Sequence, residues 1–85
     1  MNSASSLGLG DASDEECAAR AQAGDESSLA ELVRRYTPGV FNVFARAYSN
    51  RDMAADDTQE VFLRVHKNLR SFDTGRSFKT WIFTI

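Results

Sequence analysis

The chain has 85 residues, of which 42% are hydrophobic and 26% are charged, and its formal net charge is −2. This length predicts one domain, and this balance is typical of a globular protein rather than a disordered one. No apolar run approaches the roughly 18 residues that a membrane-spanning helix needs, and the first residues lack the pattern of a secretory signal. A single cysteine, Cys17, excludes a disulfide within the chain and fits a reducing compartment. We therefore expect a cytoplasmic protein that does not associate with membranes.

The charges are unevenly distributed. Residues 1–60 carry five Lys or Arg and eleven Asp or Glu, a net charge of −6, whereas residues 61–85 carry five and one, a net charge of +4. The sequence pI of about 5.2 argues against indiscriminate nucleic-acid binding. The later, basic segment also contains aromatic residues, which is compatible with a single-stranded nucleic-acid contact. Charge alone favours a simpler interpretation, a solvated face of basic residues near helix C-termini.

A disordered tail followed by a short helix is expected at the N-terminus. Residues 1–13 are rich in Ser, Gly and Ala without periodicity, which predicts the tail. Asp14 can cap a helix whose first turn holds two glutamates, where the helix dipole favours acids. Gly24 is expected to end this helix and Asp25 to cap the next. Cys17 is on the small apolar face, so we expect a buried thiol rather than a reactive one.

A long amphipathic segment follows. Apolar residues recur at spacings of three and four over residues 29–48, which predicts helix. Pro38 interrupts the pattern, because its ring removes a backbone donor and disfavours helical geometry at Thr37. The segments 26–36 and 39–49 are therefore either two helices or one bent helix.

A third helix is expected from about Met53 to Leu69, with Asp52 as its cap. Its inward stripe comprises Ala54, Thr58, Val61, Phe62, Val65 and Leu69. A different face carries Asp56, Gln59, Glu60, Leu63 and Lys67. Leu63, among hydrogen-bonding groups, is either an ordinary exposed leucine or the centre of a partner-binding patch.

The last segment combines a loop at residues 70–77 with a fourth helix capped by Ser77. This helix would have only about nine residues and no stop signal, so we expect the natural chain to continue beyond Ile85. The segment joins flat apolar surfaces to phosphate-pairing cations, as single-stranded DNA binding requires; these residues are Phe72, Phe78 and Trp81 with Arg70, Arg76 and Lys79. Aromatic residues at helical spacing often belong to a core, so Phe78 and Trp81 are expected to be at least partly buried.

Catalysis finds little support. A metal site would need ligands from Asp56, Asp57, Glu60 and His66. His66 follows Glu60 by six residues, which is about 240° around a helix, so one helix cannot bring them together. There is no second histidine, no cysteine pair, no glycine-rich phosphate loop and no nucleophile elbow. We expect no catalytic residue, no metal and no cofactor, and interpret the acids as a solvated face.

Taken together, the segments described above resemble region 2 of the extracytoplasmic-function (ECF) sigma factors of the sigma-70 family. The opening segment DEECAARAQAGDESSLAELVRRYTPGVF resembles the first two helices of that group. The segment DDTQEVFL, Asp56–Leu63, resembles region 2.2, and FDTGRSFKTWIFTI, Phe72–Ile85, resembles region 2.3 running into region 2.4. The order and spacing make the match specific from Asp14 onward. The resemblance implies an all-α bundle of three to four helices over residues 14–85, cut short at its C-terminus.

The resemblance also implies two partners. One is core RNA polymerase, bound through the clamp helices of its β′ subunit by Asp56, Gln59, Glu60 and Leu63. The other is the non-template strand of the promoter −10 element. A loop there would capture a base flipped out of the duplex, which carries onto Phe72, Asp73, Thr74, Gly75, Arg76, Ser77 and Phe78. The basic and aromatic pattern adds Lys79 and Trp81 to this DNA-binding set.

Two alternatives remain beside this reading. The first is a helical module that binds polymerase or an anti-sigma factor without any DNA readout of its own. The second, more distant, is a metal-dependent enzyme. Two departures from the family pattern also matter. Asp57 stands where an apolar residue is usual, and the chain ends before most of the helix that reads the −10 element and before the domain that binds the −35 element.

Overall fold

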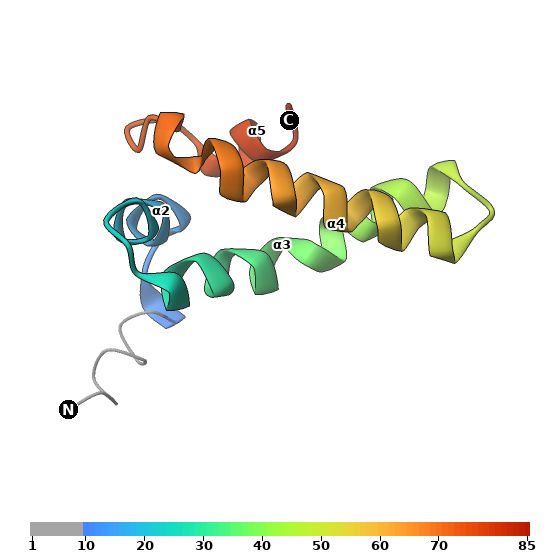
Figure 1. The fold of residues 1–85 in the computed structure, drawn as a ribbon, viewed down its shortest axis with the longest axis horizontal. Helices are drawn as coiled ribbons and strands as arrows, with labels where there is room; N and C mark the ends of the chain where they lie inside the picture. Colours follow the sequence, from blue (N-terminus) through green and yellow to red (C-terminus); the bar gives the residue numbers. More distant parts are fainter. Residues whose placement is uncertain (1–9) are drawn as a thin grey trace.

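The computed structural model describes residues 10–85, which form helices and no strand. The elements in chain order are α2 (Asp14–Gln22), α3 (Glu26–Ala47), α4 (Arg51–Asn68), the 3-10 turn η1 (Leu69–Ser71) and α5 (Phe78–Ile82). Figure 1 shows α3 and α4 as a long antiparallel pair, with α2 crossing one end of it and α5 lying at that same end. The prediction of an all-α bundle of three to four helices is therefore confirmed.

The N-terminal boundary differs from the prediction in part. Residues 1–9 of the predicted tail lie outside the described residues, but Ala12 is buried in the core. Ser13, not Asp14, caps α2 in a reciprocal capping box with Glu16, at 3.0 and 2.8 Å. Asp14 instead accepts hydrogen bonds from α3, including one from the Tyr36 hydroxyl. The packed domain thus begins before Asp14.

Helix α3 is continuous across Pro38, which selects the single helix from the two alternatives. Pro38 is exposed and lies inside the helix. Pro38 has no backbone N–H to donate. The hydroxyl of the residue before it, Thr37, donates to the Val33 carbonyl at 2.6 Å, one turn earlier in the helix. The start of α3 follows the prediction: Gly24 adopts a φ of 104° and Asp25 is the cap.

Helix α4 begins at Arg51, slightly earlier than predicted. Its cap is Asn50 rather than Asp52, and the Asn50 side chain accepts from the Asp52 and Met53 amides at 2.8 and 3.2 Å. Asp52 lies in the first turn, where its negative charge interacts favourably with the helix dipole. The predicted inward stripe is confirmed: Ala54, Thr58, Val65 and Leu69 are buried, and Val61 and Phe62 are half-buried.

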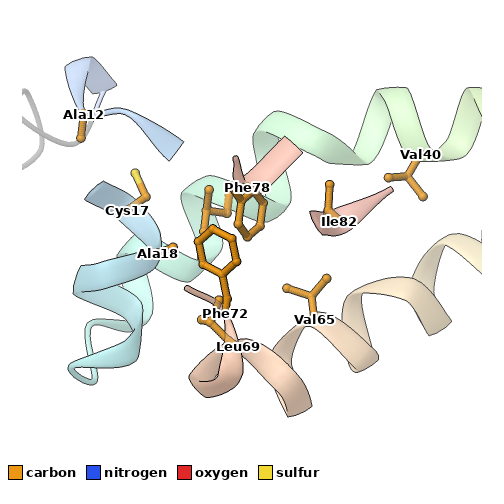
Figure 2. Close-up of a cluster of buried hydrophobic side chains, with 10 residues drawn as sticks. Ala12, Cys17, Ala18, Val40, Val65, Leu69, Phe72, Phe78 and Ile82 are labelled. Atoms are coloured by element: carbon orange, nitrogen blue, oxygen red, sulfur yellow. The ribbon is translucent and has the colours of Figure 1, made fainter. Parts of the chain in front are cut away.

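One core joins all the helices (Figure 2). Its buried hydrophobic residues are Ala12, Cys17, Ala18, Leu32, Val40, Val65, Leu69, Phe72, Phe78 and Ile82. Phe78, from the short α5, is fully buried and lies between residues of α2, α3 and α4. Cys17 is fully buried as predicted, and burial raises the pKa of its thiol. Within residues 10–85, no helix is long and apolar enough to cross a membrane.

Candidate protein and nucleic-acid interfaces

The solvent side of α4 carries the residues predicted to bind polymerase. We call it the α4 outer face, and it comprises Met53, Asp56, Gln59, Glu60, Leu63 and Lys67, all exposed. At about 100° per residue this stripe lies roughly opposite the buried stripe of the same helix. Leu63 is 59% exposed, and a shallow depression beside it is lined by Glu60, Arg64, His66 and Lys67. An apolar side chain ringed by polar groups is a typical centre of a protein interface.

Met53 extends the α4 outer face and is absent from the predicted site. It is 51% exposed and lies one helical turn before Asp56, in line with Glu60 and Leu63. The spacing of residues 53, 56, 60 and 63 indicates a shared helix face, but from the sequence Met53 is predicted only as the start of the helix. The outer face therefore has an apolar residue near each end and acids between them.

A groove opens between the loop after η1 and helix α5. We call it the loop groove; it has a volume of about 520 Å³ and is lined by Ser71, Phe72, Asp73, Arg76, Ser77, Thr80, Trp81 and Thr84. Pockets of roughly 300–1,000 Å³ with apolar walls and a few polar groups are typical of small-ligand sites. Three lining residues, Ser71, Thr80 and Thr84, are absent from the predicted site. The helical spacing of 77, 80, 81 and 84 could have identified the two threonines.

Three aromatic rings pack against one another at the loop groove, in tilted and edge-to-face contacts. The Phe72 and Trp81 ring centroids are 5.1 Å apart, and Phe78 lies 5.4 Å from Phe72 and 5.6 Å from Trp81. Phe72 and Phe78 are buried, at 5% and 0% exposure, whereas Trp81 is half-buried. The first two rings are thus core residues in this conformation, and Trp81 is the aromatic side chain that a ligand can reach.

The polar rim of the loop groove is a compact turn. Asp73 Oδ1 accepts from the Gly75 amide at 2.9 Å, and the Asp73 carbonyl accepts from the Arg76 amide at 2.9 Å. A Cβ atom at Gly75 would lie 3.2 Å from Asp73 Oδ1, so glycine suits this close approach. Arg76 and Asp73 are 3.7 Å apart and both well exposed, so this ion pair contributes little to stability and leaves the guanidinium accessible.

The other four predicted DNA-binding residues do not line the groove: Thr74, Gly75, Lys79 and the buried Phe78. Thr74 is half-buried at the turn, and Gly75 and Lys79 are exposed without lining the groove. The structure therefore brings five of the nine predicted residues to the groove lining: Phe72, Asp73, Arg76, Ser77 and Trp81. Ser77 also caps α5, where its hydroxyl accepts from the Thr80 amide at 3.2 Å.

Asp57 on α4 has a hydrogen-bond partner in Tyr48, the residue that follows α3. Its Oδ2 accepts a hydrogen bond from the Tyr48 hydroxyl at 2.6 Å, and this bond raises the pKa of Tyr48. Asp57 is half-buried and lies between the outer face and the buried stripe. Where an apolar residue is usual, Asp57 therefore makes a specific hydrogen bond from α4 to the residue that follows α3. Within residues 10–85, no three His, Cys, Asp or Glu side chains cluster as metal ligands would.

Comparison with known proteins agrees with this arrangement. The family described as Sigma-70 region 2 matches residues 32–85. The chain is 36% identical over 62 residues to the ECF RNA polymerase sigma factor SigW of Bacillus subtilis, which covers 73% of this chain and 33% of the relative. It is 33% identical over 66 residues to the ECF RNA polymerase sigma-E factor of Haemophilus influenzae, covering 78% of this chain and 34% of the relative. No solved structure matches it.

A third relative is the ECF RNA polymerase sigma factor SigE of Mycolicibacterium smegmatis, 32% identical over 65 residues, or 73% of this chain and 25% of the relative. The chain thus spans between a quarter and about a third of the length of these curated relatives. The family match covers well over half of the chain, and the helices that it covers carry both candidate interfaces. The chain therefore belongs to the sigma-70 region 2 family, in its ECF group.

Proposed function

We propose that this chain acts in bacterial transcription initiation, binding core RNA polymerase through the α4 outer face and the −10 element through the loop groove. The observation that carries the proposal is the loop groove itself, where a reachable tryptophan lies beside an exposed arginine and several hydroxyls. Both proposed partners are cytoplasmic in bacteria. The relatives named above are sigma factors of RNA polymerase, and their names support the choice of partner.

The α4 outer face suits a helical and basic partner such as the β′ clamp helices. Asp56, Gln59 and Glu60 present acceptors, and Leu63 offers an apolar anchor beside them. Glu60 forms an exposed ion pair with Arg64, at 3.6 Å, which a partner's cation can displace at small cost. The charges at the rim steer association, and Leu63 supplies affinity when the partner buries it.

The loop groove suits one flipped base and its neighbouring phosphates. Trp81 provides a face for stacking, the hydroxyls of Ser71, Ser77 and Thr80 can bond base edges, and Arg76 can pair with phosphate. Flipping a base costs a few kcal/mol of lost stacking, which binding in the groove must offset. No covalent step is needed, because promoter melting is selective binding of the open strand and hence a shift in population.

The polymerase interface is tested with the Gln59→Ala, Glu60→Ala double variant. We expect it to bind fluorescently labelled core RNA polymerase more weakly, by tenfold or more, while its circular dichroism stays that of the wild type. The matched control is Asn42→Ala, Arg46→Ala, which removes two exposed polar side chains from α3 and should leave affinity unchanged. Equal binding by all three proteins would contradict the proposed interface.

The DNA interface is tested with a single-stranded oligonucleotide carrying a −10 sequence, on the assembled polymerase complex. Trp81 is the only tryptophan of the chain, so labelling it with 5-fluorotryptophan gives a fluorine signal that reports stacking. The double variant Arg76→Ala, Lys79→Ala should bind the oligonucleotide more weakly. The slope of log affinity against log salt concentration should become shallower by about 0.7 for each lost phosphate contact. Two results would count against DNA contact: a salt dependence in the double variant equal to that of the wild type, and a fluorine signal of Trp81 that does not respond to the oligonucleotide.

The acidic pI keeps one alternative in view: a module that binds polymerase or an anti-sigma factor without reading DNA. That alternative predicts polymerase binding that depends weakly on salt, together with no response of Trp81 to the oligonucleotide. The two experiments above therefore separate the two functions.

A further inference from the structure

Helix α2 holds both ends of the segment that forms the rim of the loop groove. Glu15 Oε2 accepts a hydrogen bond from the Phe78 amide at 2.7 Å, at the start of α5. Gln22 Nε2 donates to the carbonyl of Leu69, the first residue of η1, at 2.9 Å and to the carbonyl of Phe72, the residue after η1, at 2.8 Å. Both side chains are half-buried, and the bonds span 47 to 63 residues of sequence.

Two of these bonds satisfy backbone groups that the helices leave without an internal partner, the Phe78 amide and the Phe72 carbonyl, whereas the Leu69 carbonyl also accepts from the Phe72 amide at 3.0 Å. The Phe78 amide belongs to the first turn of α5, and the Leu69 and Phe72 carbonyls belong to a 3-10 turn and the residue after it. Leaving such partly buried groups without partners is unfavourable, so the loop stays where α2 places them. The two anchored residues of the loop, Phe72 and Phe78, are also the rings that support Trp81.

Helix α2 is itself braced against α3. Asp14 Oδ1 accepts from Arg35 Nη1 at 2.9 Å, and its other oxygen accepts from the Tyr36 hydroxyl. Tyr36 in turn contacts the Phe78 ring edge-on, at 5.5 Å between centroids. The brace therefore runs from α3 through α2 to the loop. Helix α2, residues 14–22, lies entirely outside the residues matched by the family.

We propose that Glu15 and Gln22 are positioning residues that preform the loop groove before a base enters it. This inference rests on the proposed function of the loop. The rim residues Asp73, Arg76 and Ser77 lie on the short segment between the two anchors, so fixing its ends limits how far they move. A preformed groove avoids the entropy of ordering the loop during binding, which raises affinity for the flipped base. Polymerase affinity does not depend on this brace.

The test compares four variants of the 85-residue chain: Gln22→Ala, Glu15→Ala, Glu15→Gln and Glu16→Ala. Glu15→Gln keeps an oxygen that can accept from the Phe78 amide, so it is the conservative rescue. Glu16→Ala breaks the capping box of the same helix without touching the loop, so it controls for a general weakening of α2. Each variant is first checked for fold and melting temperature by circular dichroism.

Three quantities are then measured: hydrogen exchange of the loop amides, affinity for the −10 oligonucleotide in the polymerase complex, and affinity for polymerase. Gln22→Ala and Glu15→Ala should exchange faster in the loop and bind the oligonucleotide about five- to tenfold more weakly, with polymerase affinity unchanged. Glu15→Gln and Glu16→Ala should resemble the wild type in oligonucleotide affinity.

Two results would overturn the inference: an equal loss of oligonucleotide affinity in Glu16→Ala, or faster loop exchange in Gln22→Ala and Glu15→Ala with unchanged oligonucleotide affinity. A wild-type complex that binds no oligonucleotide would overturn the proposed function itself. That failure is distinguishable because it appears in the wild type and not only in the variants.

Discussion

Asp57 illustrates how one polar residue can replace an apolar contact between helices. In the family pattern its position is usually apolar, yet here its carboxylate and the Tyr48 hydroxyl satisfy one another at 2.6 Å. The bond joins the residue after α3 to the second turn of α4, across the connection at residues 48–50. It therefore stabilises the angle at which α4 leaves α3, without occupying the α4 outer face.

A double-mutant cycle tests this bond. Tyr48→Phe and Asp57→Ala should each lower the free energy of unfolding by about 1 kcal/mol, because each removes the same hydrogen bond. The double variant should lose little more than either single variant, as measured by urea unfolding. Strictly additive losses would show that the two side chains do not depend on each other. Polymerase affinity should remain unchanged in all three variants.

Glu31 predicts how stability responds to acid. It accepts from Arg34 Nη2 at 2.6 Å and from Arg35 Nε at 2.8 Å, and these hydrogen bonds lower the pKa of Glu31 to about 2 from an ordinary 4.5. Because the folded pKa is depressed, the stabilisation is fully present above about pH 4.5 and is lost as the pH falls towards 2. In urea unfolding, Glu31→Gln should lose less stability than the wild type between pH 5 and pH 2.5. Identical losses would contradict this role.

At the scale of elements, helix ends are set by short local signals. Gly24 ends the α2 turn with a φ of 104°, where a Cβ atom is strained, whereas Gly39 lies inside α3 in helical geometry. A Cβ at Gly39 would meet only Phe83 Cζ, at an ordinary 3.8 Å. The two glycines therefore have opposite needs within the same protein.

The same substitution at these two glycines should have opposite effects. Gly24→Ala should lower the free energy of unfolding by about 1 kcal/mol, because alanine is disfavoured at positive φ. Gly39→Ala should raise it by about 0.5–1 kcal/mol, because alanine loses less backbone entropy in a helix. Thermal and urea unfolding measure both. A loss of stability in both variants would show that the Gly39 site has no room after all.

At the scale of the whole molecule, one core makes the loop groove depend on every helix. The short α5 supplies the fully buried Phe78, and the rings beneath Trp81 are packed by residues of α2, α3 and α4. A helix of five residues is not stable alone, so α5 exists because its inner side chains are buried against the others. Loss of tertiary packing should therefore abolish the groove before it abolishes α3 and α4.

Cys17 provides a probe of that packing. Its side chain is fully buried and its thiol pKa is raised by burial, so little of it is reactive thiolate in the folded protein. Labelling by a disulfide reagent should be slow without denaturant and should accelerate with urea in parallel with loss of the Trp81 fluorescence signal. Rapid labelling in native buffer would show that α2 detaches from the core while the rest stays folded.

Much of this protein was determined by its sequence alone. The helical character of residues 26–47, the inward stripe of α4, the buried Cys17 and the glycine turn at residue 24 all depend on signals within a few residues of one another, whereas the sequence left open whether Pro38 divides the long segment into two helices. Helical periodicity and capping repeat every three or four residues, so a sequence displays them directly. The sequence predicted Asp14 and Asp52 as helix caps, whereas the structure has Ser13 and Asn50 in these roles. Ser, Asn and Asp all cap well, and only the backbone path selects one of them.

The tertiary structure alone decided which residues face the loop groove. Phe72, Phe78 and Trp81 look alike in a sequence, but Phe72 and Phe78 are buried in the core, whereas Trp81 lines the groove and is only half-buried. The bonds from Glu15 and Gln22 to the loop, and from Asp57 to Tyr48, likewise depend on how helices cross. Their physical reason is the same: a buried donor or acceptor must find a partner, and the nearest one in space can lie anywhere in the sequence.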